Sequence, residues 1–211
     1  KAVLQIQKES LVASYYAKTK FEEKATPSDA EIAAFYEKEK AKFKGATIAQ
    51  AGDYIKQQLM QRKLMEESQN LVERLKEKAA IEKDADVIAK LAEADKSKRP
   101  TSGWVAKIDG KEISVEEFEN LYYAQNMNAY NAATRDDIDK IAAEPSQVQR
   151  NPLLARGTFL DEVIKQRLVY NEAVAEKMLE KEELKANMQL QMESICTWYY
   201  VKHKFAKDIE V

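Results

Sequence analysis

Histidine and cysteine carry much of the nucleophilic, proton-transfer and zinc chemistry of proteins, and each occurs once in this 211-residue chain. His203 and Cys196 are seven residues apart, so one face of a helix could present both to a transition metal. One such pair completes neither a zinc site nor a catalytic triad. We therefore interpret them as a helix-surface histidine and a half-buried thiol, and expect no metal and no internal disulfide.

Other catalytic patterns are also missing from the sequence. The many carboxylates sit among lysines at helix-surface spacing, which is typical of solvated faces, with a buried acid pair as the alternative. The five glycines do not have the spacing of a phosphate-binding loop. The net charge of −2 lacks the basic excess of a nucleic-acid-binding surface. We expect no enzymatic activity, no cofactor and no nucleic-acid partner.

Apolar side chains are the remaining candidates for binding. Methionine adapts to varied partners, and aromatic rings bury large areas against many sequences. Neighbouring residues on a helix point about 100° apart, so Tyr15 and Tyr16 cannot both face one core, and one of them could face a groove. Packing between helices is the alternative for every such residue. The candidate client-binding residues are Tyr15, Tyr16, Met60, Met65, Tyr122, Tyr123, Met192, Trp198, Tyr199 and Tyr200.

The composition and the spacing of apolar residues favour long amphipathic helices. Only five Gly and four Pro are available for turns, whereas 33% of the residues are charged and 45% hydrophobic. Ser28 and Glu31 have the spacing of a capping box, which marks the start of a helix. We predict helices over residues 1–24, 28–43, 47–79, 85–95 and 158–182.

One short β-hairpin interrupts this helical pattern. Residues 105–108 and 111–113 are joined by Asp109-Gly110, a dipeptide typical of tight hairpin turns. Ser114 and Glu117 then predict a second capping box. For residues 126–157 we predict a weak helix near 134–143 and irregular chain elsewhere. The predicted fold class is mainly α, with long helices and a single hairpin.

The two ends of the chain are related in sequence. Residues 1–24 and 185–208 align without gaps at an offset of 184 and share the pattern Q-x-Q-x-E-S…Y-Y-x-K-x-K-F. We interpret this as a duplication in which residues 1–95 form the rear half of one module, 96–103 a linker, and 104–211 the front half of a second module. Each half alone would leave an apolar face open. We therefore expect two chains to exchange halves in a domain-swapped homodimer.

Several segments resemble the chaperone module of SurA-like, PrsA-like and PpiD-like periplasmic foldases. Residues 104–118 (WVAKIDGKEISVEEF) are similar to its opening hairpin and first helix, and residues 160–173 to the next helix. Residues 26–43 resemble the helix that leads into the isomerase domain, and residues 54–81 resemble the long helix and final strand that come after it. The resemblance implies a fold like the SurA N-terminal domain.

The chain departs from these families at the isomerase. A parvulin-type prolyl isomerase often lies where this sequence has only residues 44–47, and the single histidine cannot supply the paired histidines of such a site. The resemblance thus implies a periplasmic holdase chaperone that binds unfolded or exported polypeptides, such as outer-membrane proteins, in apolar helix-lined grooves. The alternatives are a prolyl isomerase with an unrecognised catalytic domain and a helical assembly protein with one specific partner.

The sequence also bears on membrane insertion and export. No apolar run approaches the roughly 20 residues of a transmembrane helix, and we predict no transmembrane segment. The chain starts at Lys1 without a methionine, which is compatible with an exported protein whose leader has been removed.

Overall fold

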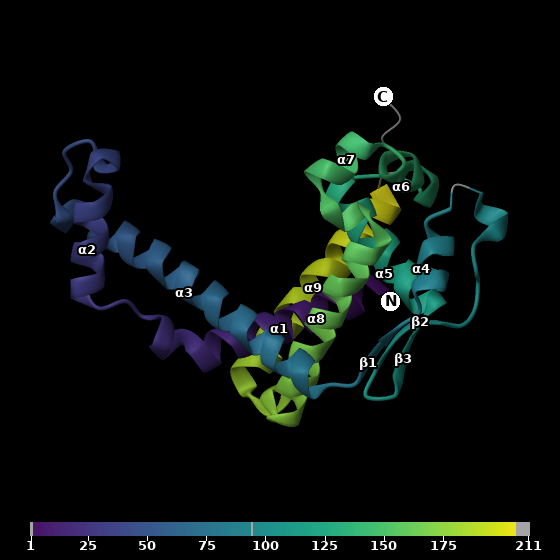
Figure 1. Cartoon of the computed structure of the whole chain (residues 1–211), viewed down its shortest axis with the longest axis horizontal. Coiled ribbons are helices and arrows are strands. Elements are labelled where there is room, and N and C mark those ends of the chain that lie inside the picture. Colours follow the sequence, from purple (N-terminus) through teal and green to yellow (C-terminus); the bar gives the residue numbers. More distant parts are fainter. Residues whose placement is uncertain (1, 94, 206–211) are drawn as a thin grey trace.

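A computed structural model describes residues 2–93 and 95–205, and this part of the chain is mainly helical, as predicted (Figure 1). Side chains are described within that range except at positions 2, 3, 198, 199, 201–203 and 205. The α-helices are α1 (Ala2–Ala25), α2 (Asp29–Glu39), α3 (Ile48–Lys78), α4 (Ala85–Leu91), α5 (Val115–Tyr130), α6 (Arg135–Ala142), α7 (Pro145–Arg150), α8 (Arg156–Ala175) and α9 (Glu182–Phe205). Short 3₁₀ turns are η1 (Lys40–Phe43), η2 (Lys96–Lys98), η3 (Pro152–Leu154) and η4 (Met178–Glu180). None of these helices is long and apolar enough to cross a membrane.

A small antiparallel sheet has the strand order β1 (Ile81–Lys83), β2 (Trp104–Ile108) and β3 (Lys111–Ser114). The predicted hairpin is confirmed. Asp109 and Gly110 both have positive φ, at 51° and 78°, as the favoured two-residue hairpin turns require. The alternation of apolar residues did not predict β1, because three residues are too few to show it, but the family resemblance of residues 54–81 implied a strand near Ile81.

One large core unites the two ends of the chain. Helices α1, α3, α5 and α8 pack together around the sheet, so residues before position 96 and after position 103 bury each other's apolar faces. Figure 1 shows α1 lying against α3 and α8. The two halves therefore close on each other within a single chain. The assignment of the halves to two modules, and the swapped homodimer, stay predictions. The largest fully buried side chains of this core are Tyr16, Tyr122, Phe21, Phe118, Leu91, Ile113, Ile138, Leu160, Leu184 and Val12.

An arm projects from this body. It consists of α2, η1 and the first half of α3, a helix about 46 Å long for its 31 residues. A second, small core of Tyr36, Ala51 and Ile55 holds the arm together. The Tyr36 hydroxyl donates to the carbonyl of Ala46 at 2.7 Å, which fixes the turn at the end of the arm. This turn comprises residues 44–47.

The capping box that starts α2 is confirmed, with Ser28 and Glu31 bonding each other's backbone amides. At α5 only half of the predicted box forms. Ser114 Oγ accepts from the Glu117 amide at 3.1 Å, but the Glu117 carboxylate accepts from Arg167 at 2.7 Å. The charge-assisted bond to the half-buried arginine outcompetes the reciprocal cap.

Two predictions on residues 126–182 are wrong. Helix α5 continues to Tyr130 and α7 forms at residues 145–150, where irregular chain was predicted. Pro145 starts α7, a position that proline favours because its missing N–H is not needed there. The helix predicted over 158–182 ends at Ala175, because Lys177 adopts a left-handed φ of 58°. The turn that follows reverses the chain into α9.

Candidate functional site

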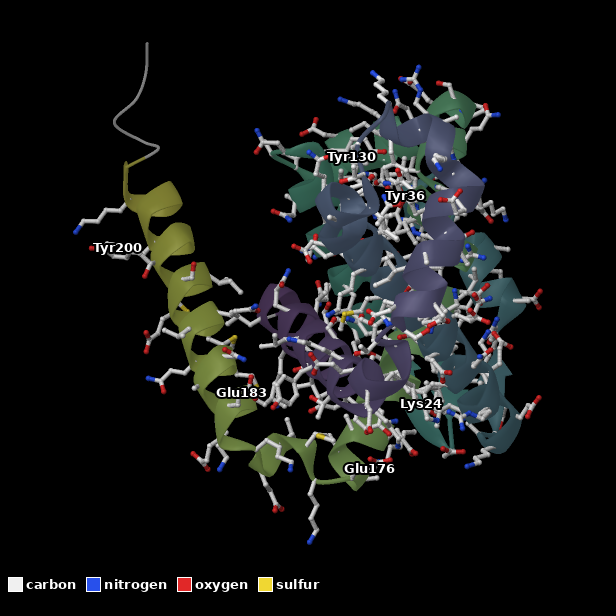
Figure 2. All side chains as sticks on the ribbon, turned by 90° about the vertical axis from the view of Figure 1, so that its left-hand side faces the viewer. Lys24, Tyr36, Tyr130, Glu176, Glu183 and Tyr200 are labelled. Atoms are coloured by element: carbon white, nitrogen blue, oxygen red, sulfur yellow. The ribbon has the colours of Figure 1, made fainter. Side chains whose placement is uncertain are left out.

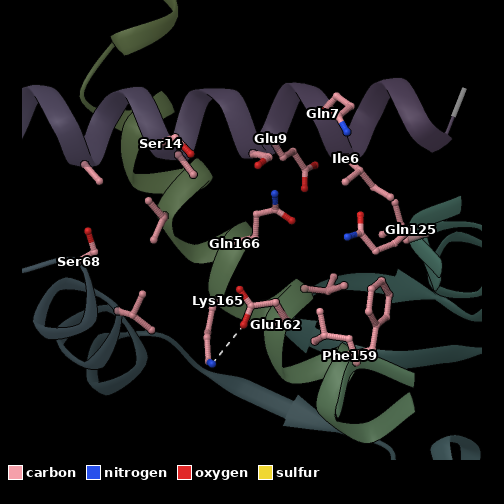
Figure 3. Close-up of a pocket in the computed structure, with 18 of the residues that line it drawn as sticks. Ile6, Gln7, Glu9, Ser14, Ser68, Gln125, Phe159, Glu162, Lys165 and Gln166 are labelled. Carbon is pink, nitrogen blue, oxygen red and sulfur yellow. Dashed lines mark hydrogen bonds and ion pairs between the residues drawn. The ribbon is translucent and has the colours of Figure 1, made fainter. Parts of the chain in front are cut away.

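A cleft of about 630 Å³ opens between α1, α3, α5 and α8 (Figure 3). Figure 3 shows α1 running along one side of it and α8 along the other. Apolar side chains of the core line part of the cleft, and amides, hydroxyls and charged groups line the rest. The apolar lining is Ile6, Ala13, Ala17, Leu71, Val72, Leu121, Leu153, Phe159, Val163 and Val169. The polar lining is Gln7, Glu9, Ser10, Ser14, Ser68, Gln125, Glu162, Lys165 and Gln166.

The cleft exists because α1 presents small side chains to it. Val12 and Tyr16 point into the core and are fully buried, whereas Ala13, Ser14 and Ala17, one or two positions further along the helix, line the cleft. Small side chains on that face leave the space between α1 and α8 unfilled. The local sequence of α1 therefore fixes one side to the core and leaves the other side open.

A chain of charges begins at Glu9, which lines the cleft. Glu9, only 3% exposed, accepts from Arg167 Nε at 3.2 Å, and Arg167 Nη2 donates to Glu117 at 2.7 Å. Burial would lower the pKa of Arg167, but the hydrogen bond that it donates to Glu117 and the charge of Glu9 outweigh this effect and raise that pKa. The guanidinium therefore stays charged, and it ties α1 and α5 to α8.

The rest of the polar lining suits recognition of peptide groups. Side-chain amides such as Gln125 and Gln166 offer both donors and acceptors, and the Ser10 and Ser14 hydroxyls do the same. Glu162 accepts from Lys165 within its own helix at 3.2 Å. Among the described residues no group of three His, Cys, Asp or Glu side chains could hold a metal ion. The cleft thus pairs apolar contact with uncharged amides and hydroxyls, beside the charged Glu9, Glu162 and Lys165.

Three of the predicted client-binding residues lie in the core. Tyr16 and Tyr122 are fully buried and Tyr123 is 5% exposed. Their hydroxyls are also engaged, by Glu176 at 2.7 Å for Tyr16, by the Leu154 carbonyl at 2.8 Å for Tyr122 and by Asp139 at 2.9 Å for Tyr123. For these three tyrosines the structure corresponds to the alternative, packing between helices, because each ring faces the neighbouring helices.

The other predicted residues are spread over several helices. Met65 is 71% exposed on α3 and Tyr200 is 56% exposed on α9. Tyr15, Met60 and Met192 are half-buried, and the Tyr15 hydroxyl donates to Glu183. The side chains of Trp198, Tyr199 and His203 lie outside those described. Cys196 is exposed, not half-buried as predicted, because its side of α9 does not face α1.

The cleft itself was not predicted. Sequence reasoning selected large apolar residues, whereas the cleft depends on the small residues of α1 and on amides and hydroxyls of separate helices. The run Ala13-Ser14 with Ala17, adjacent to the large Val12 and Tyr16, is the signal that could have indicated an underfilled helix face. Comparisons with protein-family models, with curated proteins and with solved structures found no match to this chain. The cleft must therefore be interpreted from its own geometry.

Proposed function

We propose that this protein is a holdase-type chaperone that binds unfolded segments of exported polypeptides in the cleft between α1, α3, α5 and α8. The observation that carries the proposal is the combination of an apolar lining with uncharged amides and hydroxyls in one open cleft. Its volume of about 630 Å³ lies within the common range for ligand pockets of roughly 300–1,000 Å³. Such a cleft accommodates a few residues of an extended chain.

Binding in this cleft relies on two contributions. Apolar client side chains gain about 25 cal/mol for each Å² removed from water. The glutamine and serine side chains hydrogen-bond the client backbone, which is the same for every sequence. Affinity is therefore modest and tolerant of sequence, and release is spontaneous.

Large apolar side chains are also exposed outside the cleft. Among the described residues, five of the six large exposed hydrophobic side chains belong to two helices, α3 and α9. They are Ile48, Tyr54 and Met65 on α3, and Leu190 and Tyr200 on α9. We propose that these helices make secondary contacts with longer clients.

Location and client class rest on the resemblance to the periplasmic foldases. We propose a periplasmic protein whose clients include outer-membrane proteins. The four-residue turn Lys44–Thr47 at the end of the arm replaces the isomerase of those families. We accordingly propose that the protein holds its clients without catalysing prolyl isomerisation.

Blocking the cleft tests the proposal. Ser14 is exposed and lines the cleft, so Ser14→Trp places a large ring across it. Ser146 is exposed on α7 away from the cleft, so Ser146→Trp is a matched control. We expect the unmodified protein and Ser146→Trp to suppress aggregation of an unfolded outer-membrane protein at equimolar ratio, and Ser14→Trp to suppress it less. Equal suppression by all three proteins would place client binding elsewhere.

Two further measurements separate this proposal from its alternatives. Isomerisation of a proline-containing peptide should proceed no faster with the protein than in buffer, and acceleration would indicate an enzyme. A panel of unrelated unfolded clients should all be protected from aggregation. Protection of a single member would indicate an assembly protein with one specific partner.

A further inference from the structure

Helix α9 repeats the sequence of α1 but not its surroundings. We propose that α9 of one copy of this chain takes the place of α1 in a second copy, and that it fills the cleft there. The occupant of the site would thus be a second copy of the chain itself. The proposal depends on the equivalence of positions at an offset of 184, on burial and on the shape of the cleft.

Both helices make the same internal contacts. The Gln5 amide donates to Glu9, and the Gln189 amide donates to Glu193. Lys20 lies 4.8 Å from the ring centre of Tyr16, and Lys204 lies 5.0 Å from that of Tyr200. Helix α9 therefore has the groups of α1 in the same local arrangement.

The two repeated helices, α1 and α9, differ in how far their equivalent side chains are buried. Tyr16 is fully buried, whereas its equivalent Tyr200 is 56% exposed. In the same way, Val12 is fully buried and its equivalent Cys196 is exposed. Figure 2 shows α9 standing beside the rest of the molecule, with Tyr200 on the side that faces away from it. At the described positions Glu193, Cys196 and Tyr200, the face that buries α1 in the core is thus exposed on α9.

The surface that holds α1 would accept α9 without losing its main polar contacts. In α1, Glu9 binds Arg167, and Tyr16 and Lys20 both bind Glu176. The residues of α9 at these three positions are identical in type. They are Glu193, Tyr200 and Lys204.

Differences in size favour α9 at the cleft. The small α1 residues that border the cleft, Ala13, Ser14 and Ala17, correspond to larger residues in α9. The cleft of about 630 Å³ is larger than an indole ring, and a tryptophan that enters it would bury about 150–250 Å². In the exchange α9 would keep the polar contacts named above and add this burial, while the displaced α1 would take the exposed place that α9 leaves. The larger α9 residues are Thr197, Trp198 and Val201.

The exchange cannot occur within one chain while α9 stays helical. Glu9 pairs with Arg167 and Tyr16 with Glu176, so α1 runs parallel to α8. Suppose that Tyr200 replaced Tyr16 beside Glu176. Glu182, the first residue of α9, would then lie 18 residues before Tyr200, or about 27 Å from it along the helix. The six-residue connection from Glu176 to Glu182 spans at most about 22 Å. Only the α9 of another copy reaches this position intact.

The exchange face of α9, which includes Glu193 and Tyr200, does not take part in the contact between α1 and α9. The two helices meet through equivalent positions, Lys8 and Leu11 on α1 and Met192 and Ile195 on α9. The residues of the exchange face, such as Glu193 and Tyr200, lie outside this contact and are exposed. If the cleft binds clients as proposed above, the exchanged form would be a reserve state whose cleft is closed.

The test combines the mass in solution with the reactivity of the native thiol. Light scattering after size exclusion should show dimers that increase with protein concentration. Cys196 is exposed in the single chain but would occupy the buried position of Val12 after exchange. Its reaction with a maleimide should therefore slow in proportion to the dimer fraction. Monomers at all concentrations, or dimers whose thiol reacts at the monomer rate, would overturn the proposal.

Two substitutions, one in α9 and one in α1, should both weaken the exchange. Trp198→Ser gives α9 the small residue of α1, and Ser14→Trp lets α1 fill the cleft itself, so both should lower the dimer fraction. Tyr54→Ala and Ser146→Trp, on exposed sites outside the exchange, should leave it unchanged. Dimers that survive both substitutions would form through another surface and refute the proposal. The assay contains no client, so its outcome is independent of the aggregation test.

Discussion

Arg156 and Glu119 form a buried ion pair in which the arginine Nε donates to a carboxylate oxygen at 2.9 Å. The arginine side chain is only 5% exposed. It also donates to the Tyr123 hydroxyl at 2.9 Å and lies 4.3 Å from the ring centre of Tyr122. Burial would lower the pKa of Arg156, but its bond to Glu119 outweighs this and raises the pKa. The pair fixes the start of α8 against α5, close to the cleft.

Removing this arginine should destabilise the fold strongly. In Arg156→Met the apolar volume is largely kept, but Glu119 loses its partner in a partly buried position. Breaking a buried pair from one side costs about 3–5 kcal/mol. Urea unfolding should show a loss of free energy of unfolding in this range. Arg150→Met, at an exposed site on α7, is the control and should change stability by less than about 0.5 kcal/mol.

Stability should fall in acid because of Asp139. This carboxylate is only 11% exposed and accepts from Arg99 at 3.0 Å and from Tyr123 at 2.9 Å. Burial would raise its pKa, but Lys96, Tyr123 and Arg99 together lower it below the ordinary value of 3.8. The unfolded chain therefore binds a proton more readily, and this contribution is present above the ordinary pKa and is lost as the pH falls through the lowered one.

Asp139→Asn tests this account through the pH dependence of unfolding. The substitution should lower stability at neutral pH, because the amide does not balance the nearby cations. It should also make the acid limb of the free energy of unfolding shallower. An acid limb of unchanged slope would show that other carboxylates account for it.

Stability should also fall at alkaline pH, because of Tyr122. Burial raises its pKa from 10.0 to about 12. Between these values the folded state keeps a proton that the unfolded state has lost, so stability is full below pH 10 and declines as the pH rises toward 12. The decline amounts to at most about 3 kcal/mol for this one group. Tyr122→Phe should make it shallower, although the lost hydrogen bond to Leu154 lowers stability at neutral pH.

Tyrosinate absorbance and unfolding, measured together as the pH rises, test this prediction. Tyrosinate absorbance should rise together with unfolding, and not before it, for the buried ring. Tyr54→Phe, at a side chain that is 56% exposed, should leave the alkaline decline unchanged. Ionisation of Tyr122 in a chain that is still folded would contradict the assigned cause.

Local signals in the sequence predicted most of the elements. The Asp109-Gly110 dipeptide requires positive φ at both residues, and the Ser28–Glu31 box is complete within four residues. Where tertiary contacts decide, the prediction failed. Glu117 binds Arg167, fifty positions away, instead of completing its cap, and the left-handed Lys177 has no local glycine or proline signal.

The sequence prediction missed the cleft for a related physical reason. A cavity is the space that side chains of several helices leave unfilled, and its borders come from α1, α3, α5 and α8. Periodicity identifies the residues that fill a core, such as Val12 and Tyr16. It does not show how far α1 lies from α8 at the face of α1 that carries Ser14. The predicted aromatic residues were selected for size, and size is what placed Tyr16 and Tyr122 in the core.

The arm should unfold separately from the body. Its core consists of Tyr36, Ala51 and Ile55 with a few half-buried neighbours, whereas the second half of α3 belongs to the main core through Leu71. Small clusters open at lower free energy than large ones. Ile55→Ala removes a fully buried side chain and should cost about 2–5 kcal/mol within the arm alone. Hydrogen exchange should then lose protection in α2 and the first half of α3, with α5 and α8 unchanged.

Leu71→Ala provides the matched comparison in the same helix. Leu71 is 3% exposed in the main core, so this substitution should lower the free energy of global unfolding by a similar amount. Exchange in α5 and α8 should then accelerate along with that in α3. If Ile55→Ala instead reduced protection equally in the arm and in α8, the arm and the body would be one cooperative unit. The length of α3 would then transmit stability between the two cores, because its hydrogen-bonded backbone is continuous from Ile48 to Lys78.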